Sequence, residues 1–138
     1  MGSISINNNP RIIIIQKLYE KNLNRDSELE FPKHRYKKFI KDVVKGTLER
    51  KELIEESISL HLGEDIHFEK TEKLLIILLQ AAVFEFLYKP QTAINIIINE
   101  YLNTAKAFLD ENQKRFLNAL LDKISKKIRT KNEWIWNY

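Results

Sequence analysis

The sequence contains no cysteine and only three glycines among its 138 residues. Without cysteine the chain cannot form a disulfide framework, a thiolate zinc site or a cysteine nucleophile, and it suits a reducing cytoplasm. Glycine is scarce and no segment alternates steadily between polar and apolar residues, which is the pattern of a half-buried β-strand. We therefore predict a compact all-α domain in the cytoplasm.

Long hydrophobic runs are also missing. The longest, "LLIILLQAAVFEFLY" from Leu74 to Tyr88, falls short of the roughly 20 apolar residues that span a bilayer, and it carries Gln80 and Glu85. The N-terminus lacks the basic segment and apolar core of a secretory signal. We expect no membrane association, and we interpret the run as the central helix of a soluble core.

Catalytic motifs are absent as well. The sequence has no glycine-rich phosphate loop, no nucleophile elbow and no pair of metal-binding histidines on a helix face. The best metal candidate is "HLGEDIH", residues 61–67, which we interpret as solvated residues at a helix end and in a turn. We expect no enzymatic activity, no cofactor and no metal.

The charge is only mildly basic, with 23 Lys and Arg against 19 Asp and Glu, a net charge of +4. Basic residues concentrate at 33–38 ("KHRYKK"), 113–115 ("QKR") and 126–131 ("KKIRTK"). Each cluster taken alone is best interpreted as a solvated helix face, so the balance favours an anionic partner only weakly.

The first helix is predicted over residues 10–23. Asn9 is a good N-cap and Pro10 suits the first helical position, where a missing N–H costs nothing. Apolar residues follow at spacings of three and four. The β-branched run "IIII" lowers helix propensity by tenths of a kcal/mol per residue, which side-chain burial outweighs.

Five further helices follow from the same periodicity. The second begins at Pro32, and the third ends at Gly63. The apolar fourth helix covers residues 69–88, and the fifth covers 91–108. Asp110 and Gln113 resemble a capping box that opens the sixth. These helices predict either two three-helix subdomains or an irregular bundle.

We divide the chain into a flexible N-terminus (1–9), a single helical domain (10–131) and an aromatic C-terminal tail (132–138). The tail, "NEWIWNY", would expose costly apolar surface if it stayed in water. We predict that it folds back onto the helical body or onto a second subunit.

Five segments, in order, resemble one family. They are "IIQKLYE" (14–20), "FIKDVVKGTLERKELIEESI" (39–58), "LLQAAVFEF" (78–86), "INEYLNTAKAF" (98–108) and "RFLNALLDKI" (115–124). Together they resemble the NusB family of bacterial transcription antitermination factors, over about residues 11–129. The resemblance implies a compact all-α domain of six to seven helices arranged as two three-helix subdomains.

The resemblance also implies a function and its partners. NusB-type proteins are non-enzymatic adaptors that bind a boxA-like single-stranded RNA together with the ribosomal protein NusE, and act on the RNA polymerase elongation complex during ribosomal RNA transcription. The alternative is a NusB-like module for protein–protein interaction or homodimerisation that has lost specific RNA binding.

Site residues follow from the matching positions. Those implied for RNA binding are Arg11, Gln16, Tyr19, Gln80, Lys114, Arg115 and Asn118, and those implied for the NusE interface are Phe84, Glu85, Asn112 and Phe116. Three of them have open alternatives: Tyr19 and Phe116 as core residues, and Glu85 as an internally paired charge. We expect Arg11 on an exposed turn, close enough to Lys114 and Arg115 to form one groove.

The chain departs from the family pattern where RNA binding is concerned. Asn7, Asn8 and Asn9 stand where the family has arginines, Gln80 replaces another arginine, and Ala119 replaces a glycine. Losing about three phosphate contacts would weaken the salt dependence of RNA binding accordingly. The asparagines could hydrogen-bond bases, or they could reflect an AT-rich genome.

Overall fold

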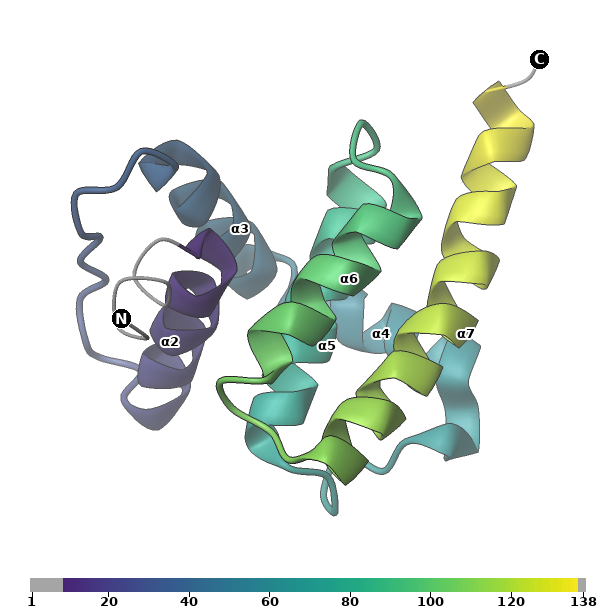
Figure 1. The fold of residues 1–138 in the computed structure, drawn as a ribbon, viewed down its shortest axis with the longest axis horizontal. Coiled ribbons are helices and arrows are strands. Elements are labelled where there is room, and N and C mark those ends of the chain that lie inside the picture. The colour runs from purple at the N-terminus through teal and green to yellow at the C-terminus, as the bar shows by residue number, and fades with distance from the viewer. Residues whose placement is uncertain (1–8, 137–138) are drawn as a thin grey trace.

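The structure is a computed structural model that describes the backbone of residues 9–136 and the side chains of residues 9–129. Within this part the chain forms six α-helices, one short 3₁₀ helix and no strand (Figure 1). The helices are α2 (Pro10–Leu23), α3 (Lys37–Glu49), α4 (Lys51–Leu62), η1 (Gly63–Asp65), α5 (Lys73–Tyr88), α6 (Ile94–Ala105) and α7 (Glu111–Trp136). The predicted all-α fold is confirmed.

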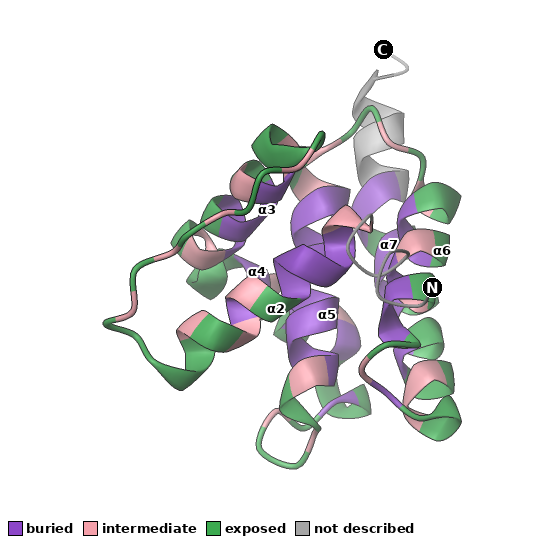
Figure 2. Ribbon diagram, turned by 60° about the vertical axis from the view of Figure 1, so that its left-hand side comes forward, coloured by how far each residue is buried: buried purple, intermediate pink, exposed green. Residues whose placement is uncertain are grey.

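Helix α5 lies at the centre of the domain and is buried on every side from Leu75 to Phe86 (Figure 2). It packs against all five other α-helices. The pair α2 and α3 lies on one side of it, and α4, α6 and α7 lie on the other (Figure 1). The two groups of helices therefore share α5 and one continuous core.

The start of α2 forms as the sequence predicts. The side chain of Asn9 accepts hydrogen bonds from the backbone N–H groups of Arg11 and Ile12, and Pro10 occupies the first turn. The four isoleucines are all buried, as is Leu18. Burial on most of the circumference explains why a helix here tolerates four β-branched residues in a row.

Three helices begin later than predicted. Residues 24–36 are a link of turns and extended chain, and Pro32 precedes α3 by five residues. Helix α5 begins at Lys73 because a turn closed by the Thr71 hydroxyl on the carbonyl of His67 comes before it. Helix α6 begins at Ile94, after a turn at 89–92. Local periodicity extended these helices into turns: a side-chain hydrogen bond closes the turn before α5, and the backbone bond from the Thr92 N–H to the Lys89 carbonyl closes the turn before α6.

Two contacts fix how the helices meet in the core. Gly46 of α3 lies against the ring of Phe84, and a Cβ at residue 46 would stand 2.3 Å from that ring. Arg129 of α7 is buried and donates to the carbonyl oxygens of Phe86, Lys89 and Thr92, at 2.6, 2.9 and 3.0 Å. It thereby caps the end of α5, whose last carbonyls lack helical partners.

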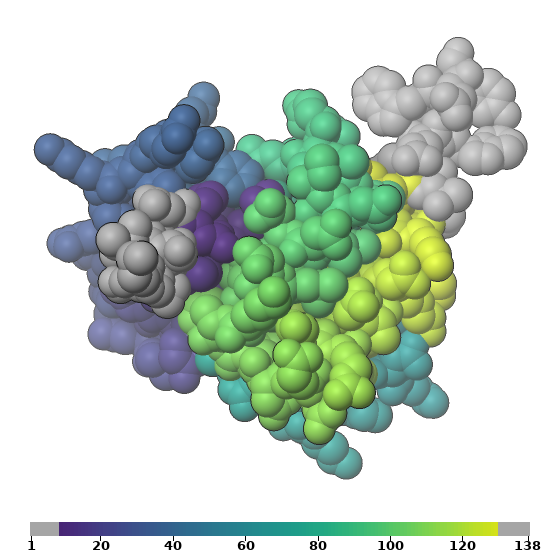
Figure 3. Space-filling model, viewed as in Figure 1, coloured from purple at the N-terminus to yellow at the C-terminus, as the bar shows by residue number. Residues whose placement is uncertain are grey.

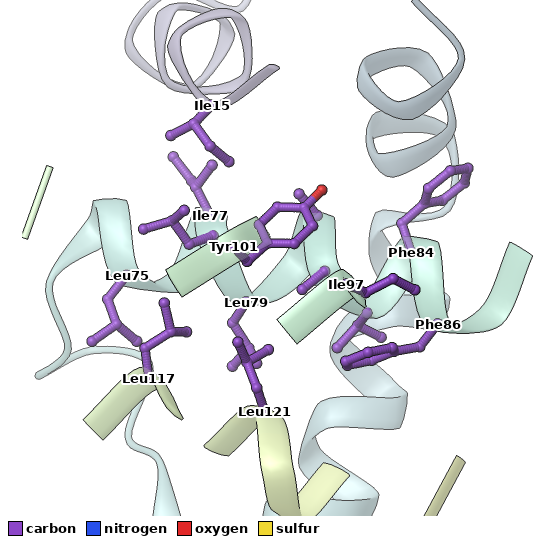
Figure 4. Packing of buried hydrophobic residues seen from close by; sticks show 14 of the residues in the cluster. Ile15, Leu75, Ile77, Leu79, Phe84, Phe86, Ile97, Tyr101, Leu117 and Leu121 are labelled. Carbon is purple, nitrogen blue, oxygen red and sulfur yellow. The ribbon is translucent and has the colours of Figure 1, made fainter. Parts of the chain in front are cut away.

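Apolar side chains from four helices fill the remaining centre. Ile15 of α2, Ile77 of α5 and Tyr101 of α6 meet above Leu117 and Leu121 of α7 (Figure 4). No helix of the described part is long and apolar enough to cross a bilayer. Helix α7 continues to Trp136, but the side chains of the C-terminal tail lie outside the described residues, so its fold-back stays a prediction.

Candidate functional site

Arg11 is buried, with only 9% of its surface exposed, so the prediction of an exposed Arg11 is wrong. Its guanidinium binds both carboxylate oxygens of Glu85, with Nε 2.9 Å from Oε2 and Nη2 2.7 Å from Oε1. Glu85 is fully buried in the last turn of α5. A buried carboxylate needs a cation, and the first turn of α2 supplies it. The internal-pairing interpretation of Glu85 is confirmed.

Aromatic residues complete this buried charge cluster. The Tyr101 hydroxyl donates to Glu85 Oε2, and the Arg11 guanidinium lies 5.0 Å from the Phe39 ring centre and 5.5 Å from that of Tyr101. The carboxylate of Glu100 approaches Arg11 to 3.8 Å. The cluster joins α2, α3, α5 and α6, and it pairs the Arg11 guanidinium with two carboxylates, at the inner end of a surface pocket that Arg11 lines with Tyr36.

Burial and charge shift two pKa values in this cluster. Burial raises the pKa of Tyr101 well above its ordinary value, and the negative charge of Glu85 adds to the effect. For Arg11, burial acts to lower the pKa, but the hydrogen bonds and charge of Glu85 raise it overall. Both shifts favour one protonation state, a neutral tyrosine beside an ion pair.

Two other predicted site residues lie in the interior. Phe84 is 5% exposed and packs on Gly46 and on the ring of Tyr88, 5.1 Å away. Gln80 is 8% exposed and donates from Nε2 to Glu55 Oε1 at 3.1 Å. Phe84 and Glu85 hold helices together here and present no surface to a partner. Gln80 lines a cavity of about 340 Å³.

The outer side of α2 carries the two remaining N-terminal candidates. Gln16 is exposed, and Tyr19 is half-buried against the core, in line with its structural alternative. Gln16 lines a groove of about 590 Å³ between α2 and the 24–36 link. The other lining residues are Ile13, Lys17, Glu30, Phe31, Pro32, Lys33 and His34. The sequence did not identify Lys17 and Phe31 as groove residues, although the basic cluster 33–38 includes Lys33 and His34 of the opposite wall.

The start of α7 presents a second group. Asp110 and Gln113 form the predicted capping box, with reciprocal bonds of 2.8 and 3.2 Å. The predicted residues that are exposed here are Asn112, Arg115, Phe116 and Asn118. Lys114 is partly buried and pairs with Glu111. Phe116 is 38% exposed, and the neighbouring Leu117 enters the core in its place.

Helix α6 separates the two groups. Helix α2 packs against α3, α5 and α6, while α7 packs against α4, α5 and α6, so α6 lies between them (Figure 1). Figure 3 shows the surfaces of α2 and α6 next to each other on one face. With Arg11 buried beneath this junction, the groove expected between it and Lys114 and Arg115 does not form among the described residues.

No cluster of three or more histidine, aspartate or glutamate side chains in the described part of the chain could hold a metal ion. Asp65, in the segment with the best metal pattern, instead pairs with Lys123 of α7. This ion pair joins η1 to α7.

Comparison with known proteins gives one consistent result. A sequence profile of the NusB family matches residues 4–126. The chain is 32% identical over 93 residues to transcription antitermination protein NusB of Sphingopyxis alaskensis, covering 67% of this chain and 62% of that protein. It is 32% identical over 115 residues to the protein of the same name from Oceanobacillus iheyensis, covering 79% and 90%.

A solved structure gives the same fold. The structure described as T. maritima NusB superimposes with a TM-score of 0.77 at 23% identity, covering 91% of this chain and 94% of that one. The match to the Sphingopyxis protein spans 62% of its length, as does that to NusB of Novosphingobium aromaticivorans. The family profile nevertheless covers most of the chain, and the helical architecture agrees with it. This chain belongs to the NusB family.

Proposed function

We propose that the protein is a non-enzymatic adaptor in transcription antitermination. It binds boxA-like single-stranded RNA jointly with the ribosomal protein NusE and acts on the RNA polymerase elongation complex. Support comes from family membership and from relatives that carry the name transcription antitermination protein NusB. The buried charge cluster has a structural part in this function, because it holds α2 and α6 side by side.

The single observation that carries the proposal is the groove beside Gln16. Lys17 and Lys33 supply positive charge from its two walls, and Phe31 and His34 supply rings. Single-stranded RNA offers unstacked bases for aromatic contact and phosphates for lysine, so this combination suits it. Gln16, exposed between them, has an amide that can donate to or accept from a base edge.

The start of α7 suits the protein partner. Phe116 offers an exposed ring, and the polar side chains of Asn112 and Asn118 accompany it. An aromatic anchor within a polar rim is the usual form of a protein-binding hot spot. Lys114 and Arg115 lie on the same turns and would meet RNA where it leaves the partner.

A salt-dependent titration tests the proposal. Labelled boxA RNA is titrated with the protein, with and without NusE, across a salt series. Tighter binding of boxA than of a scrambled RNA is expected when NusE is present. No preference under any condition would refute the proposed function.

The groove is tested by a matched pair of variants. Lys17→Gln with Lys33→Gln should reduce the slope of log affinity against log salt by about 1.4, at roughly 0.7 per phosphate contact on a single strand. Lys45→Gln with Lys126→Gln removes the same charge from exposed residues outside the groove and should leave the slope unchanged.

A second candidate function keeps the fold without RNA recognition. Arg11 is engaged inside the domain, and this observation favours it. In that case the protein works through homodimerisation or through contact with polymerase. Light scattering and a NusE pull-down discriminate, because a dimer that retains NusE but ignores RNA would support the second candidate.

A further inference from the structure

A second cavity, of about 340 Å³, opens beside the C-terminal half of α2. Four helices and the following link contribute its walls. The lining residues are Leu18, Lys21 and Asn22 of α2, Arg25 of the link, Thr47 and Leu48 of α3, Lys51 of α4, and Ile77 and Gln80 of α5. Apart from Gln80, none of them belongs to the positions that the family resemblance marks.

Positive charge dominates the rim of this cavity. Lys21 donates from Nζ to the carbonyl oxygen of Ser27, a neutral acceptor, and it forms no ion pair with a residue of the described part. Arg25 is exposed and forms no ion pair with any residue that the structure describes. Among the described residues, Lys51 alone of the three cations forms an ion pair, with Glu55 at 4.0 Å. Three cations therefore face one carboxylate, and such a rim attracts an anion.

The floor of the cavity is partly apolar and partly polar. Leu18, Leu48 and Ile77 form the apolar part. Thr47 is 3% exposed, and its hydroxyl has no hydrogen-bond partner among the described residues. An unpaired buried hydroxyl costs free energy, and threonine in a helix has two accessible χ1 rotamers. Because Thr47 lines the cavity, a bound ligand could supply the missing hydrogen-bond partner.

We propose that this cavity binds one nucleotide unit of the RNA strand, with its phosphodiester at Lys21, Arg25 and Lys51. The ribose or base covers the apolar floor, and Gln80 and Thr47 supply hydrogen bonds. This inference rests on the proposed function and extends it to a second subsite. Lys17 lines the first groove and Lys21 lies one helical turn further on, so one strand can follow α2 from groove to cavity.

The test compares two triple variants of the full chain in the boxA titration with NusE. In one, Lys21, Arg25 and Lys51 are each replaced by Gln. In the matched control, Lys45, Lys73 and Lys126 are replaced, because all three are exposed and none lines the cavity. For the cavity variant, the slope of log affinity against log salt should be smaller in magnitude by about 2, at roughly 0.7 per contact. When the salt concentration falls from 200 to 50 mM, the RNA affinity of the wild type should rise by a factor about 20 times larger than that of this variant.

The results separate this inference from the proposed function. If wild type and control bind RNA with the same slope as the cavity variant, the cavity is not part of the RNA path and only this inference fails. If wild type itself shows no boxA preference, the proposed function fails and the inference fails with it. If the cavity variant loses NusE binding but keeps its RNA slope, the cations face an acidic protein surface, which also overturns the inference.

A neutral substitution at the floor adds an independent readout. Thr47→Val removes the hydroxyl and keeps the shape, so it should weaken RNA binding equally at every salt concentration. The midpoint of thermal unfolding should not fall, because the hydroxyl has no partner to lose. Unchanged RNA affinity in this variant would remove Thr47 from the subsite.

Discussion

Replacing Arg11 by methionine should destabilise the protein severely. The change keeps an unbranched side chain but leaves the carboxylate of Glu85 without a cation, in a place where Glu85 is fully buried. Removing one partner of such a buried pair costs about 3–5 kcal/mol. Domains of this size have a free energy of unfolding of about 5–15 kcal/mol, so Arg11→Met should remove a large share of it.

Urea denaturation followed by circular dichroism measures this loss. The double variant Arg11→Met with Glu85→Leu removes both charges and should recover most of the stability. About 1–2 kcal/mol should remain lost, because the Tyr101 hydroxyl then has no acceptor. Lys126→Met, which breaks an exposed pair with Asp122, serves as control and should cost less than about 0.5 kcal/mol. A cost below about 1 kcal/mol for Arg11→Met would refute the buried pair.

Substitutions at three further residues test the core and a helix cap by the same assay. Tyr101→Phe should cost about 1.5–3 kcal/mol at neutral pH, because the hydroxyl donates to the carboxylate of Glu85. Since the pKa of Tyr101 is raised in the folded state, this advantage of tyrosine is complete below about pH 10 and is lost as pH rises through the raised pKa. Gly46→Ala should cost about 1–3 kcal/mol despite the better helix propensity of alanine, since its Cβ would meet the Phe84 ring; a gain in stability would show that the ring can move. Asp110→Ala should cost about 0.5–2 kcal/mol, whereas Asp110→Asn should be nearly neutral because asparagine caps equally well.

The features that the sequence predicts well are those with local causes. The cap at Asn9 and the capping box at Asp110 and Gln113 depend on side chains within three residues of the helix start, and both form as predicted. The stop at Gly63 is local as well, since its φ of 51° suits glycine. A short motif is enough to specify such features.

The role of Arg11 could not be predicted, because its partner is 74 residues away in the sequence. A cation on the first turn of an amphipathic helix normally faces solvent, and the periodicity of α2 gives no other indication. The available signal was Glu85, a charge within an otherwise apolar helix, which required a buried cation from some other element. Choosing among 23 Lys and Arg residues required the fold.

The positively charged side chains of α2 differ in what they contact along the helix. Asn9 caps the helix and Arg11 pairs with Glu85 and Glu100, so the start of α2 has no unpaired lysine or arginine among the described residues. Further along, Lys17 lies at the groove, where it pairs with the exposed Glu20 at 3.5 Å, and Lys21 lies at the cavity.

This distribution gives a last prediction. The double variant Asn7→Ala with Asn8→Ala should leave the salt slope of RNA binding unchanged, because an asparagine releases no counterion on meeting a phosphate. Removing the charges of Lys17 and Lys21 should lower the slope by about 1.4. The boxA titration with NusE measures both. A slope that falls with the asparagines, or that persists without the lysines, would move the RNA path away from the C-terminal half of α2.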